Sequence, residues 1–395
     1  MSPSLRTAAA GLLLRSLARR LPMRIAYPDG KVTGAEGPIM RLRRPRELRR
    51  RLGDDGEIGL GESYQAGDWD SDDLPALLTA VATGLAGIAP ALQKRLWRLR
   101  RVRPPRAEEG TLEAAPSNAG RHYDLPNEMF ASFLDRSMTY SSALFASRDD
   151  DLTEAQHRKI DRLLDVARVG AGSHLLEIGT GWGELAIRAA RRGARVVSVT
   201  LSEQQRRLAV ERLREAGVAD RVEVRRCDYR EVEPAPDGFD AVVSVEMVEA
   251  VGYDYWPAFA EAVLGHLRPG GRAGIQLITT DHERMLATVH AYTWIQKHIF
   301  PGGLVPSAEA IEAAFTAAGG LVEERFDFGS WHYAETLRRW RAAGEHDRTW
   351  DYYLSFCEAG FRAGYLDVSQ LVVVSPERAT AECPPRGDVS ERTDQ

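Results

Sequence analysis

A glycine-rich segment at residues 177–183, with the sequence EIGTGWG, holds the residues of this chain best suited to chemistry. Residues 173–176 before it are predicted to form a short buried strand, and residues 184–192 after it a helix with one apolar face. Glycines between a strand and a helix let the backbone pass close to a ligand and adopt φ values that other residues resist. The segment therefore predicts a nucleotide-binding corner.

Two side chains of this segment favour S-adenosylmethionine (SAM) over a dinucleotide. Glu177 precedes the glycines, where a carboxylate suits the ammonium group of a ligand better than a pyrophosphate. Trp182 lies inside the loop, where its indole ring would crowd a diphosphate. Phosphate-binding Rossmann corners share the glycine pattern, so the pattern alone does not exclude them. An ordinary tight turn between a strand and a helix is the other alternative.

The composition is that of a globular chain from a reducing compartment. Its 395 residues are 44% hydrophobic and include 35 glycines, and this length predicts two or three domains. No apolar run is long enough to span a bilayer, and residues 8–14 suit an amphipathic helix better than a secretory signal. Three widely spaced cysteines, Cys227, Cys357 and Cys383, show no metal-binding spacing. We therefore expect a cytoplasmic protein without a metal site.

The net charge of −5 hides an uneven distribution. Residues 1–106 carry 20 Lys or Arg against 11 Asp or Glu, whereas the remainder of the chain is acidic. Arginines concentrate in two runs, residues 41–51 and 94–106, together with leucine or tryptophan. Such runs suit an anionic surface, either phospholipid or nucleic acid, and the alternative is a solvated helix face. Because the chain shows no zinc pattern or RNP motif, we expect phospholipid and no nucleic acid as the partner.

The order of predicted elements divides the chain into parts. Residues 1–101 form a small basic α+β domain, 102–120 a linker, and 121–375 a domain in which strands and helices alternate. An aromatic-rich insertion at 281–306 interrupts the alternation, and residues 376–395 are predicted to be disordered. The predicted strands of the second domain are His174–Ile178, Ala194–Thr200, Val222–Arg226, Phe239–Val245, Gly271–Thr279, Leu321–Phe328 and Leu371–Ser375. This alternation predicts an α/β fold with a doubly wound parallel sheet.

Several motifs of the second domain together resemble the cyclopropane-fatty-acid synthase family of SAM-dependent methyltransferases. The matching motifs are His122-Tyr123-Asp124, Thr139-Tyr140-Ser141, Glu177 to Gly183, Thr200 to Gln205, Glu249 to Gly252 and Trp294 to Gly303. The resemblance covers residues 120–375 and is specific, because unlike motifs agree in order and spacing. It implies that residues 121–375 are a Rossmann-like methyltransferase domain and that the basic N-terminal domain is associated with lipid.

Members of this family transfer the methyl group of SAM to a cis double bond in a phospholipid acyl chain. Because an alkene is a weak nucleophile, such a site must hold the reactants in line and keep water away. Methyl transfer leaves a carbocation, which aromatic faces stabilise, and a base must then remove a proton. Ring closure gives a cyclopropane. A hydride shift before proton loss gives a methylene group instead, which a separate reductase can convert into a methyl branch.

The resemblance also implies which residues bind the cofactor. By resemblance, SAM is contacted by Tyr140, Ser141, Gly179, Gly181, Thr200, Leu201 and Gln205, while Glu177 and Gly183 belong to the same corner. Asp228 and Tyr229 occupy the adenine-proximal position after the third strand. The alternatives are structural roles, such as core packing for Tyr140 or helix capping for Thr200.

Five positions of the expected anion site bear on the product. By resemblance, cyclopropane synthases hold a bicarbonate ion as proton acceptor with a Cys, a Glu, a His and a Tyr. Here the Glu is Glu249 and the Tyr is Tyr333, but Ser142 replaces the Cys and Gln276 replaces the His. Glu246 stands three residues before Glu249, where the family usually has Gly. A fixed carboxylate would repel a bound anion, so we interpret Glu246 as a built-in base, with helix capping as the alternative.

These departures favour a methylene product, such as the 10-methylene precursor of a 10-methyl fatty acid, and they argue against bicarbonate as a cofactor beside SAM. One alternative is a cyclopropane synthase that uses bound bicarbonate. Others are a methyltransferase for small molecules or carrier-bound acyl chains and a SAM-binding regulator. The expected partner is a phospholipid bilayer with anionic headgroups and unsaturated chains, contacted peripherally at the inner face of the membrane. The resemblance also allows for a separate reductase and for a homodimer.

Overall fold

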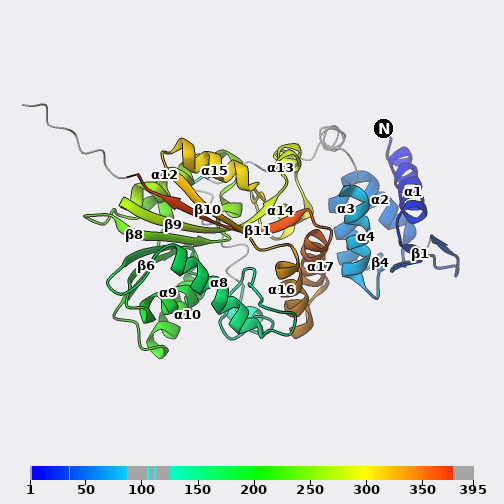
Figure 1. The fold of residues 1–395 in the computed structure, drawn as a ribbon. Helices are drawn as coiled ribbons and strands as arrows, with labels where there is room; N and C mark the ends of the chain where they lie inside the picture. Colours follow the sequence, from blue (N-terminus) through cyan, green and yellow to red (C-terminus); the bar gives the residue numbers. More distant parts are fainter. Residues whose placement is uncertain (1, 35, 87–104, 106–110, 113–124, 377–395) are drawn as a thin grey trace, which may run out of the picture.

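The computed structural model contains two packed units, an N-terminal unit before residue 87 and a C-terminal unit after residue 124 (Figure 1). The structure describes residues 2–34, 36–86, 105, 111–112 and 125–376. Some sequence predictions lie wholly or almost wholly outside this part of the chain: the linker at 102–120, the arginine run at 94–106, the motif at 122–124 and the tail at 376–395.

The N-terminal unit is a small sheet packed with helices, so its predicted α+β character is confirmed. Its elements are α1 (Pro3–Arg20), β1 (Arg24–Ala26), β2 (Val32–Gly34), β3 (Ile39–Leu42), α2 (Pro45–Asp55), α3 (Glu57–Gln65), β4 (Trp69–Asp70) and α4 (Leu74–Ala86). The strands lie in the order β2-β1-β3-β4. Gly56 alone joins α2 to α3, and its φ of 60° is one that a glycine adopts without strain.

A seven-stranded sheet with the order β10-β11-β9-β8-β5-β6-β7 forms the centre of the C-terminal unit. Its strands are β5 (His174–Ile178), β6 (Arg195–Thr200), β7 (Val222–Arg226), β8 (Phe239–Val245), β9 (Leu267–Thr280), β10 (Leu321–Asp327) and β11 (Leu366–Val374). The five strands from β9 to β7 are parallel to one another, which confirms the doubly wound α/β fold. The chain winds outward from β5 in both directions, and this arrangement opens a crevice at the carboxyl ends of the central strands.

One strand departs from the predicted parallel sheet. Strand β11 runs antiparallel to both β9 and β10. Its first residue, Leu366, pairs with Thr280 at the carboxyl end of β9. Helix α17 (Arg348–Arg362) precedes β11 by a short connection, so the chain enters the sheet from that end and has to run backwards. The strand also begins before the predicted Leu371.

Helices cover both faces of the sheet (Figure 1). Helices α12 and α15 lie on one face, and α8, α9 and α10 lie on the other. The remaining bounds are α7 (Asn127–Ala131), α8 (Leu152–Val166), α9 (Glu184–Arg191), α10 (Glu203–Glu215), α11 (Val248–Val251), α12 (Trp256–His266), α13 (His282–Thr288), α14 (Trp294–His298), α15 (Ala308–Ala317) and α16 (Trp331–Ala343), with 3₁₀ turns η2 (Tyr229–Glu231) and η3 (Tyr253–Tyr255). Helix α8 shows why they pack: Ile160, Leu163 and Leu164 share one face, and all three are buried.

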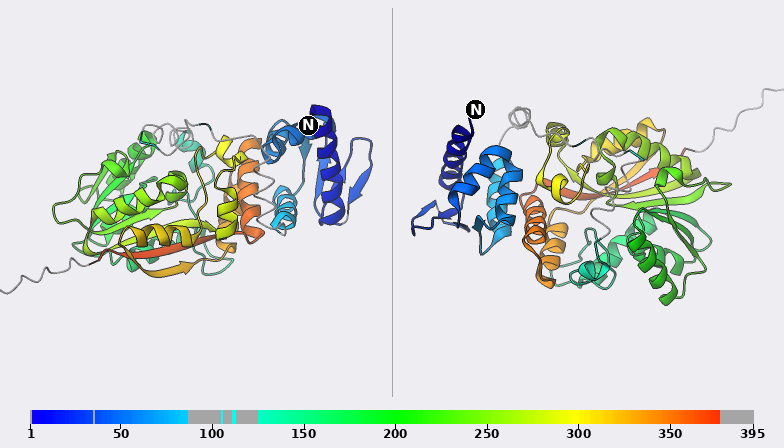
Figure 2. Two further views of the ribbon diagram at one scale, coloured as in Figure 1. Left: turned by 90° about the horizontal axis from the view of Figure 1, so that it is seen from above. Right: turned by 180° about the vertical axis from the view of Figure 1, so that it is seen from behind.

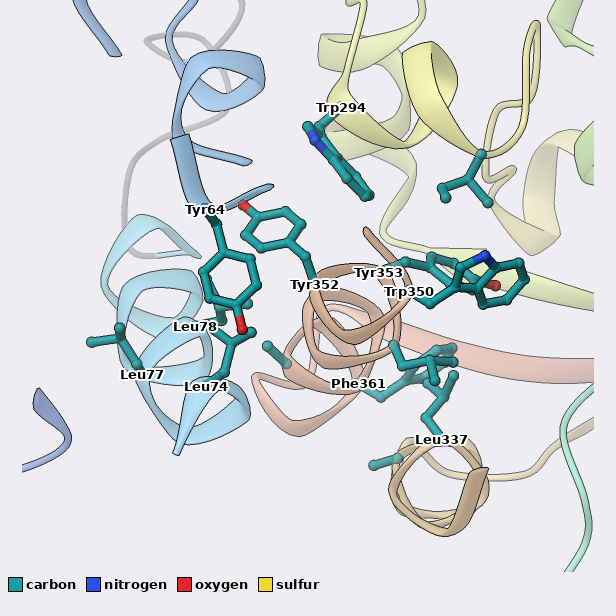
Figure 3. Packing of buried hydrophobic residues seen from close by; sticks show 14 of the residues in the cluster. Tyr64, Leu74, Leu77, Leu78, Trp294, Leu337, Trp350, Tyr352, Tyr353 and Phe361 are labelled. Atoms are coloured by element: carbon teal, nitrogen blue, oxygen red, sulfur yellow. The ribbon is translucent and has the colours of Figure 1, made fainter. Parts of the chain in front are cut away.

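Helix α17, which the sequence analysis did not predict, joins the two units (Figure 3). It packs against α16 in the C-terminal unit and against α3 and α4 in the N-terminal unit. The ring of Tyr352 lies 5.5 Å from that of Tyr64 in α3 and 4.7 Å from that of Trp294 in the predicted insertion. The hydroxyl of Tyr64 donates a hydrogen bond of 2.6 Å to Asp351. An aromatic core thus holds the N-terminal unit at one end of the molecule (Figures 1 and 2).

Candidate active site

A cavity opens at the carboxyl ends of β5, β6 and β8, where the direction of winding reverses. The predicted cofactor residues that line it are Tyr140, Ser141, Glu177, Gly179, Gly181, Thr200, Leu201, Gln205, Asp228 and Tyr229. Glu246 lines the same cavity, so the predicted base shares one space with the predicted cofactor site. Phe300 and Pro301, from the predicted insertion, complete part of the wall.

The glycine loop faces this cavity with its backbone. Gly179 and Gly181 have φ values of 99° and 52°, and a Cβ atom at Gly181 would meet no atom within 4 Å. A ligand can therefore approach the backbone closely at this point. Gly183 differs from the prediction, because it does not line the cavity. It precedes α9, and a Cβ there would lie 3.2 Å from the Cβ of Ala209 in α10, so its role is to let the two helices pack closely.

Glu177 lies beneath the loop with only 3% of its surface exposed. The hydroxyl of Ser198 donates to Glu177 Oε2 at 2.5 Å, and Thr180 Oγ1 lies 2.7 Å from the same hydroxyl. Burial raises the pKa of Glu177 to about 8. The carboxyl group is therefore mostly protonated at neutral pH, and a cationic ligand group in the cavity would favour its ionised form. This environment fits the predicted pairing with a ligand ammonium group.

Side chains after β6 and β7 are fixed by their own hydrogen bonds. Thr200 Oγ1 donates to Gln205 Oε1 at 2.8 Å, which orients that amide at the start of α10. The Asp228 carboxylate accepts from the Arg230 guanidinium at 2.8 Å and also caps η2. The ring of Tyr229 packs edge-on against a phenylalanine of α12 and is largely buried. These positions border the cavity in defined conformations.

Aromatic rings form the wall around Tyr140. Its hydroxyl donates to the hydroxyl of Tyr353 at 2.9 Å, and its ring stacks on Trp340 with 5.2 Å between the ring centres. Phe130 packs against both Tyr140 and Trp182. Tyr140 is therefore partly core, as the alternative interpretation of the sequence held, and at the same time part of the cavity lining.

The Glu246 carboxylate is held at the other end of the cavity. Glu246 follows β8 with a φ of 49°, a left-handed conformation that is uncommon outside glycine. Its Oε1 accepts hydrogen bonds from the backbone N–H of Ser142 and from Gln276 Nε2, and its Oε2 accepts one from the Tyr333 hydroxyl, each at 2.9 Å. The three residues predicted to surround an anion thus bind this side chain, and they lie behind it rather than on the cavity wall. Ser142 acts through its backbone, because its hydroxyl donates to a neighbouring carbonyl.

Glu249 lies in α11 and has a different environment. Its Oε1 accepts a hydrogen bond from the backbone N–H of Ile278, whereas its Oε2 has no hydrogen-bond partner among the described residues. Burial and the charge of Glu246 raise the pKa of Glu249 to about 8. Burial raises the pKa of Glu246 as well, and the ammonium group of Lys159 and the three donors limit this rise. Glu246 is therefore the better place for a negative charge, and Glu249 for a proton.

Lys159 in α8 is a site residue that the sequence analysis missed. Its side chain is fully buried, and its Nζ donates to Ser141 Oγ at 2.6 Å and to the Ser142 carbonyl oxygen at 2.9 Å. In the sequence, Lys159 stands next to the apolar position Ile160 of an amphipathic helix. Nothing in that pattern distinguishes it from a surface lysine, because its partners come from another segment.

The fold and the cavity together define a class of enzyme. A sheet of this order with one reversed strand, and a glycine loop over a buried acidic residue after its central strand, are the features of a SAM-dependent methyltransferase. Residues 111–371 match the family described as mycolic acid cyclopropane synthetase, and the chain belongs to this family. The predicted resemblance is thereby confirmed. The enzyme is a SAM-dependent methyltransferase that acts on fatty acids.

Comparison with individual proteins supports the same family. Tuberculostearic acid methyltransferase UfaA1 of Mycobacterium tuberculosis is 48% identical, over 93% of this chain and 91% of its own length. The cyclopropane-fatty-acyl-phospholipid synthase of Escherichia coli is 30% identical, over 86% and 89% of the two chains. The solved structure of the cyclopropane synthase MmaA2 from M. tuberculosis superimposes with a TM-score of 0.60 at 29% identity, covering 66% of this chain and 98% of that one. CmaA1 complexed with SAH and CTAB gives a TM-score of 0.59 at 28% identity and the same coverage.

Proposed function

We propose that this enzyme methylates a cis double bond in an unsaturated acyl chain of a phospholipid and forms a methylene-branched fatty acid. The observation that carries the proposal is the Glu246 carboxylate, which lines the cofactor cavity while three hydrogen-bond donors fix it from behind. The base that removes the last proton is then a side chain of the enzyme itself. A general base of this kind contributes roughly 10²–10⁴-fold to a reaction rate.

The chemistry requires an acceptor for one proton and protection of a cation. Bound SAM would supply an electrophilic methyl group, and the electron pair of the broken sulfur–carbon bond would stay on its sulfur. Once that group is added to one alkene carbon, the other carbon is a cation, and a hydride shift from the methylated carbon moves the charge to the branch point. Glu246 then accepts a proton from the added methyl group, and the electron pair of the broken C–H bond forms the C=CH₂ bond. Rings such as that of Tyr140 keep water away and stabilise the cation without attacking it.

A bound bicarbonate ion would fit this site poorly. The donors of Ser142, Gln276 and Tyr333 already bind Glu246. A second anion beside that carboxylate would be repelled in a cavity of low dielectric constant. Glu249, which would border the anion, already has its pKa raised to about 8 by burial and by Glu246. The balance of charge therefore favours one fixed carboxylate over a carboxylate and a free anion.

The name of one relative favours a branched product over a ring. Tuberculostearic acid is 10-methylstearic acid, and the methyltransferase named after it is 48% identical to this chain. Conversion of a methylene group into a methyl branch consumes a hydride and a proton. We assign that step to a separate reductase, so the product of this enzyme alone is the methylene compound.

The arginine run at residues 41–51, predicted to bind anionic headgroups, has most of its charge paired within the protein. Asp68 is buried and forms ion pairs with both Arg44 and Arg51. Carboxylates also pair with Arg41, Arg43 and Arg50. Because a paired guanidinium group attracts a headgroup less strongly than a free one, this run is a weaker membrane anchor than its sequence suggests.

Helix α1 offers a better contact for a phospholipid surface, and we assign the bilayer contact to it. The helix contains no acidic residue, and its side chains Leu5, Leu12 and Leu13 are 49–62% exposed. Arg15 and Arg19 are exposed nearby, and no carboxylate of the described residues forms an ion pair with them. Exposed leucines beside free arginines suit the surface of an anionic bilayer. No helix in the described ranges has the length and apolar character to cross the membrane, so the proposed association is peripheral.

Product analysis tests this proposal. The full chain is incubated with SAM and vesicles of dioleoylphosphatidylglycerol, and the acyl chains are released and separated by gas chromatography. Because methylene and cyclopropane products are isomers, fragmentation or NMR must distinguish them. We expect the methylene compound, formed at a rate that added bicarbonate does not change. A cyclopropane as the main product, with activity that rises on adding bicarbonate, would overturn the proposal. Methylation of free or carrier-bound oleoyl chains alone would contradict the phospholipid assignment.

A further inference from the structure

Lys159 carries a buried positive charge between the cofactor end and the base end of the cavity. Its side chain is fully buried and belongs to the cavity wall. Burial lowers the pKa of its ammonium group to about 8, against the raising effect of Glu246 and Asp135. A lysine is almost never buried in this way without a compensating group. Its position therefore requires an explanation from the groups around it.

The hydrogen bond from Lys159 determines whether the Ser141 hydroxyl acts as donor or acceptor in this contact. An ammonium group only donates hydrogen bonds, so Ser141 Oγ must be the acceptor in the 2.6 Å contact with Nζ. The hydroxyl proton of Ser141 is then free to point elsewhere. Because Ser141 lines the cavity, this proton is available to an acceptor group of the cofactor. A neutral side chain at position 159 would not impose this direction.

A chain of hydrogen bonds also connects Lys159 to the base. Its Nζ binds the carbonyl oxygen of Ser142, whose N–H donates to Glu246. Its backbone carbonyl oxygen accepts from Gln370 Nε2, which also donates to Gln276 Oε1 at 3.0 Å. This contact fixes the orientation of the Gln276 amide, whose Nε2 donates to Glu246. The ammonium group of Lys159 thus holds the Ser142 donor in place, whereas the Gln276 donor is held through the backbone carbonyl of Lys159.

We propose that Lys159 is a positioning residue that keeps Glu246 ionised and holds the segment 140–142 in place, so that base and cofactor are aligned by one buried ammonium group. The part that concerns the base rests on the proposed function. Lys159 and Glu246 are buried groups of opposite charge that interact electrostatically without direct contact, and removing one charge leaves the other without this compensation, which is unfavourable. The other titratable groups around Glu246 are Glu249 from α11 and Tyr333 from α16. Neither carries a positive charge that could replace that of Lys159.

A thermodynamic cycle tests the coupling without measuring activity. Lys159→Met, Glu246→Gln and the double variant are compared with the parent protein by thermal denaturation. We expect each single change to lower Tm and the double variant to lose less than the two single losses combined, because it removes both charges. Lys31→Met, an exposed lysine in the turn between β1 and β2, is the matched control and should leave Tm unchanged. Fully additive losses would overturn the proposal.

The pH dependence of turnover tests positioning against a merely structural role. In Lys159→Met the acid limb of the kcat profile should move to higher pH, because Glu246 is harder to ionise. For each pH unit by which the limb moves, kcat at pH values on its acid side should fall about tenfold. Lys159→Arg, which keeps the charge, should return the limb towards its original position. A loss of kcat that is equal at every pH would overturn the proposal. If Glu246→Gln stays active while the coupling in Tm persists, the base assignment fails and the charge pairing stands.

Discussion

The two ends of the active-site cavity are built in different ways. At the cofactor end, one short segment that runs from the end of β5 to the start of α9 supplies both the buried carboxyl group of Glu177 and the glycine backbone. At the base end, Glu246 is held by groups from the loop before α8, from β9 and from α16. The first end is local in sequence, and the second is assembled from distant segments.

This difference shows how the outcome of a reaction can change while the cofactor stays the same. The glycine loop depends on backbone conformation, and any side chain that enters it displaces the ligand. The base end depends on which acceptor occupies a set of donors, and a single carboxylate such as Glu246 fulfils that requirement. Substitutions at the two ends should therefore have separable effects on cofactor affinity and on turnover.

The largest expected effect comes from filling the cofactor end. Gly181→Val should abolish SAM binding, because the new side chain would extend into the open cavity. Gly217→Val is the matched control, since Gly217 also has a positive φ, 69°, and free space around its Cβ position, but lies in the turn after α10. Titration calorimetry should detect SAM binding to the control only, with both variants folded by circular dichroism. Equal SAM affinity in the two variants would contradict the cofactor site.

The second prediction separates the two carboxyl groups of the base end. Glu246→Gln should lower turnover by about 10²–10⁴-fold and leave SAM affinity unchanged. Glu249→Gln should lower turnover by less than about tenfold, because burial and Glu246 already favour the protonated form of Glu249. Steady-state kinetics on vesicle substrate measure both losses. Similar losses in the two variants would show that both carboxyl groups contribute to proton removal, and the assignment of Glu246 alone as the base would be wrong.

The third prediction concerns the charge at the cofactor end. Burial raises the pKa of Glu177 to about 8, so the carboxyl group must release a proton to pair with the ammonium group of SAM. Affinity for SAM should therefore rise between about pH 6 and pH 8, by up to about tenfold per pH unit. Calorimetry in buffers of different ionisation enthalpy measures the released proton. Glu177→Gln should bind more weakly and without this pH dependence, and an unchanged dependence would assign the proton elsewhere.

The smallest expected effect tests whether membrane contact is independent of both ends of the cavity. Arg15→Ser and Arg19→Ser should each weaken binding to phosphatidylglycerol vesicles by about fivefold at low salt, which corresponds to ~1 kcal/mol per arginine. The effect should shrink as salt screens the exposed charges, and SAM affinity should not change. Arg50→Ser is the control, because Arg50 already pairs with Glu47 at 3.1 Å. Equal binding of the parent protein to neutral and anionic vesicles would contradict the assignment of α1.

The parallel core and the cofactor end were largely predictable from the sequence. Strands β5, β7 and β8 begin and end at the predicted residues. For β5 and β8, which are largely buried, the reason is that a strand buried on both faces is a short apolar run bounded by turn signals. The glycine loop was recognisable for a related reason, since its positive φ values restrict the residue type at each position. Both features depend on neighbours along the chain, and such neighbours are visible in the sequence.

Other features of the molecule were decided only by the tertiary structure. Ser142, Gln276 and Tyr333 lie 104, 30 and 87 residues from the carboxylate that they bind, so no local pattern shows that they meet at Glu246. The backward direction of β11 follows from where α17 ends. Three further features are also visible only in the folded chain. They are the packing role of Gly183, the ion pairs that neutralise most of the arginine run, and the burial of Lys159. Burial, charge pairing and desolvation depend on neighbours in space, and the folded chain alone determines which residues those are.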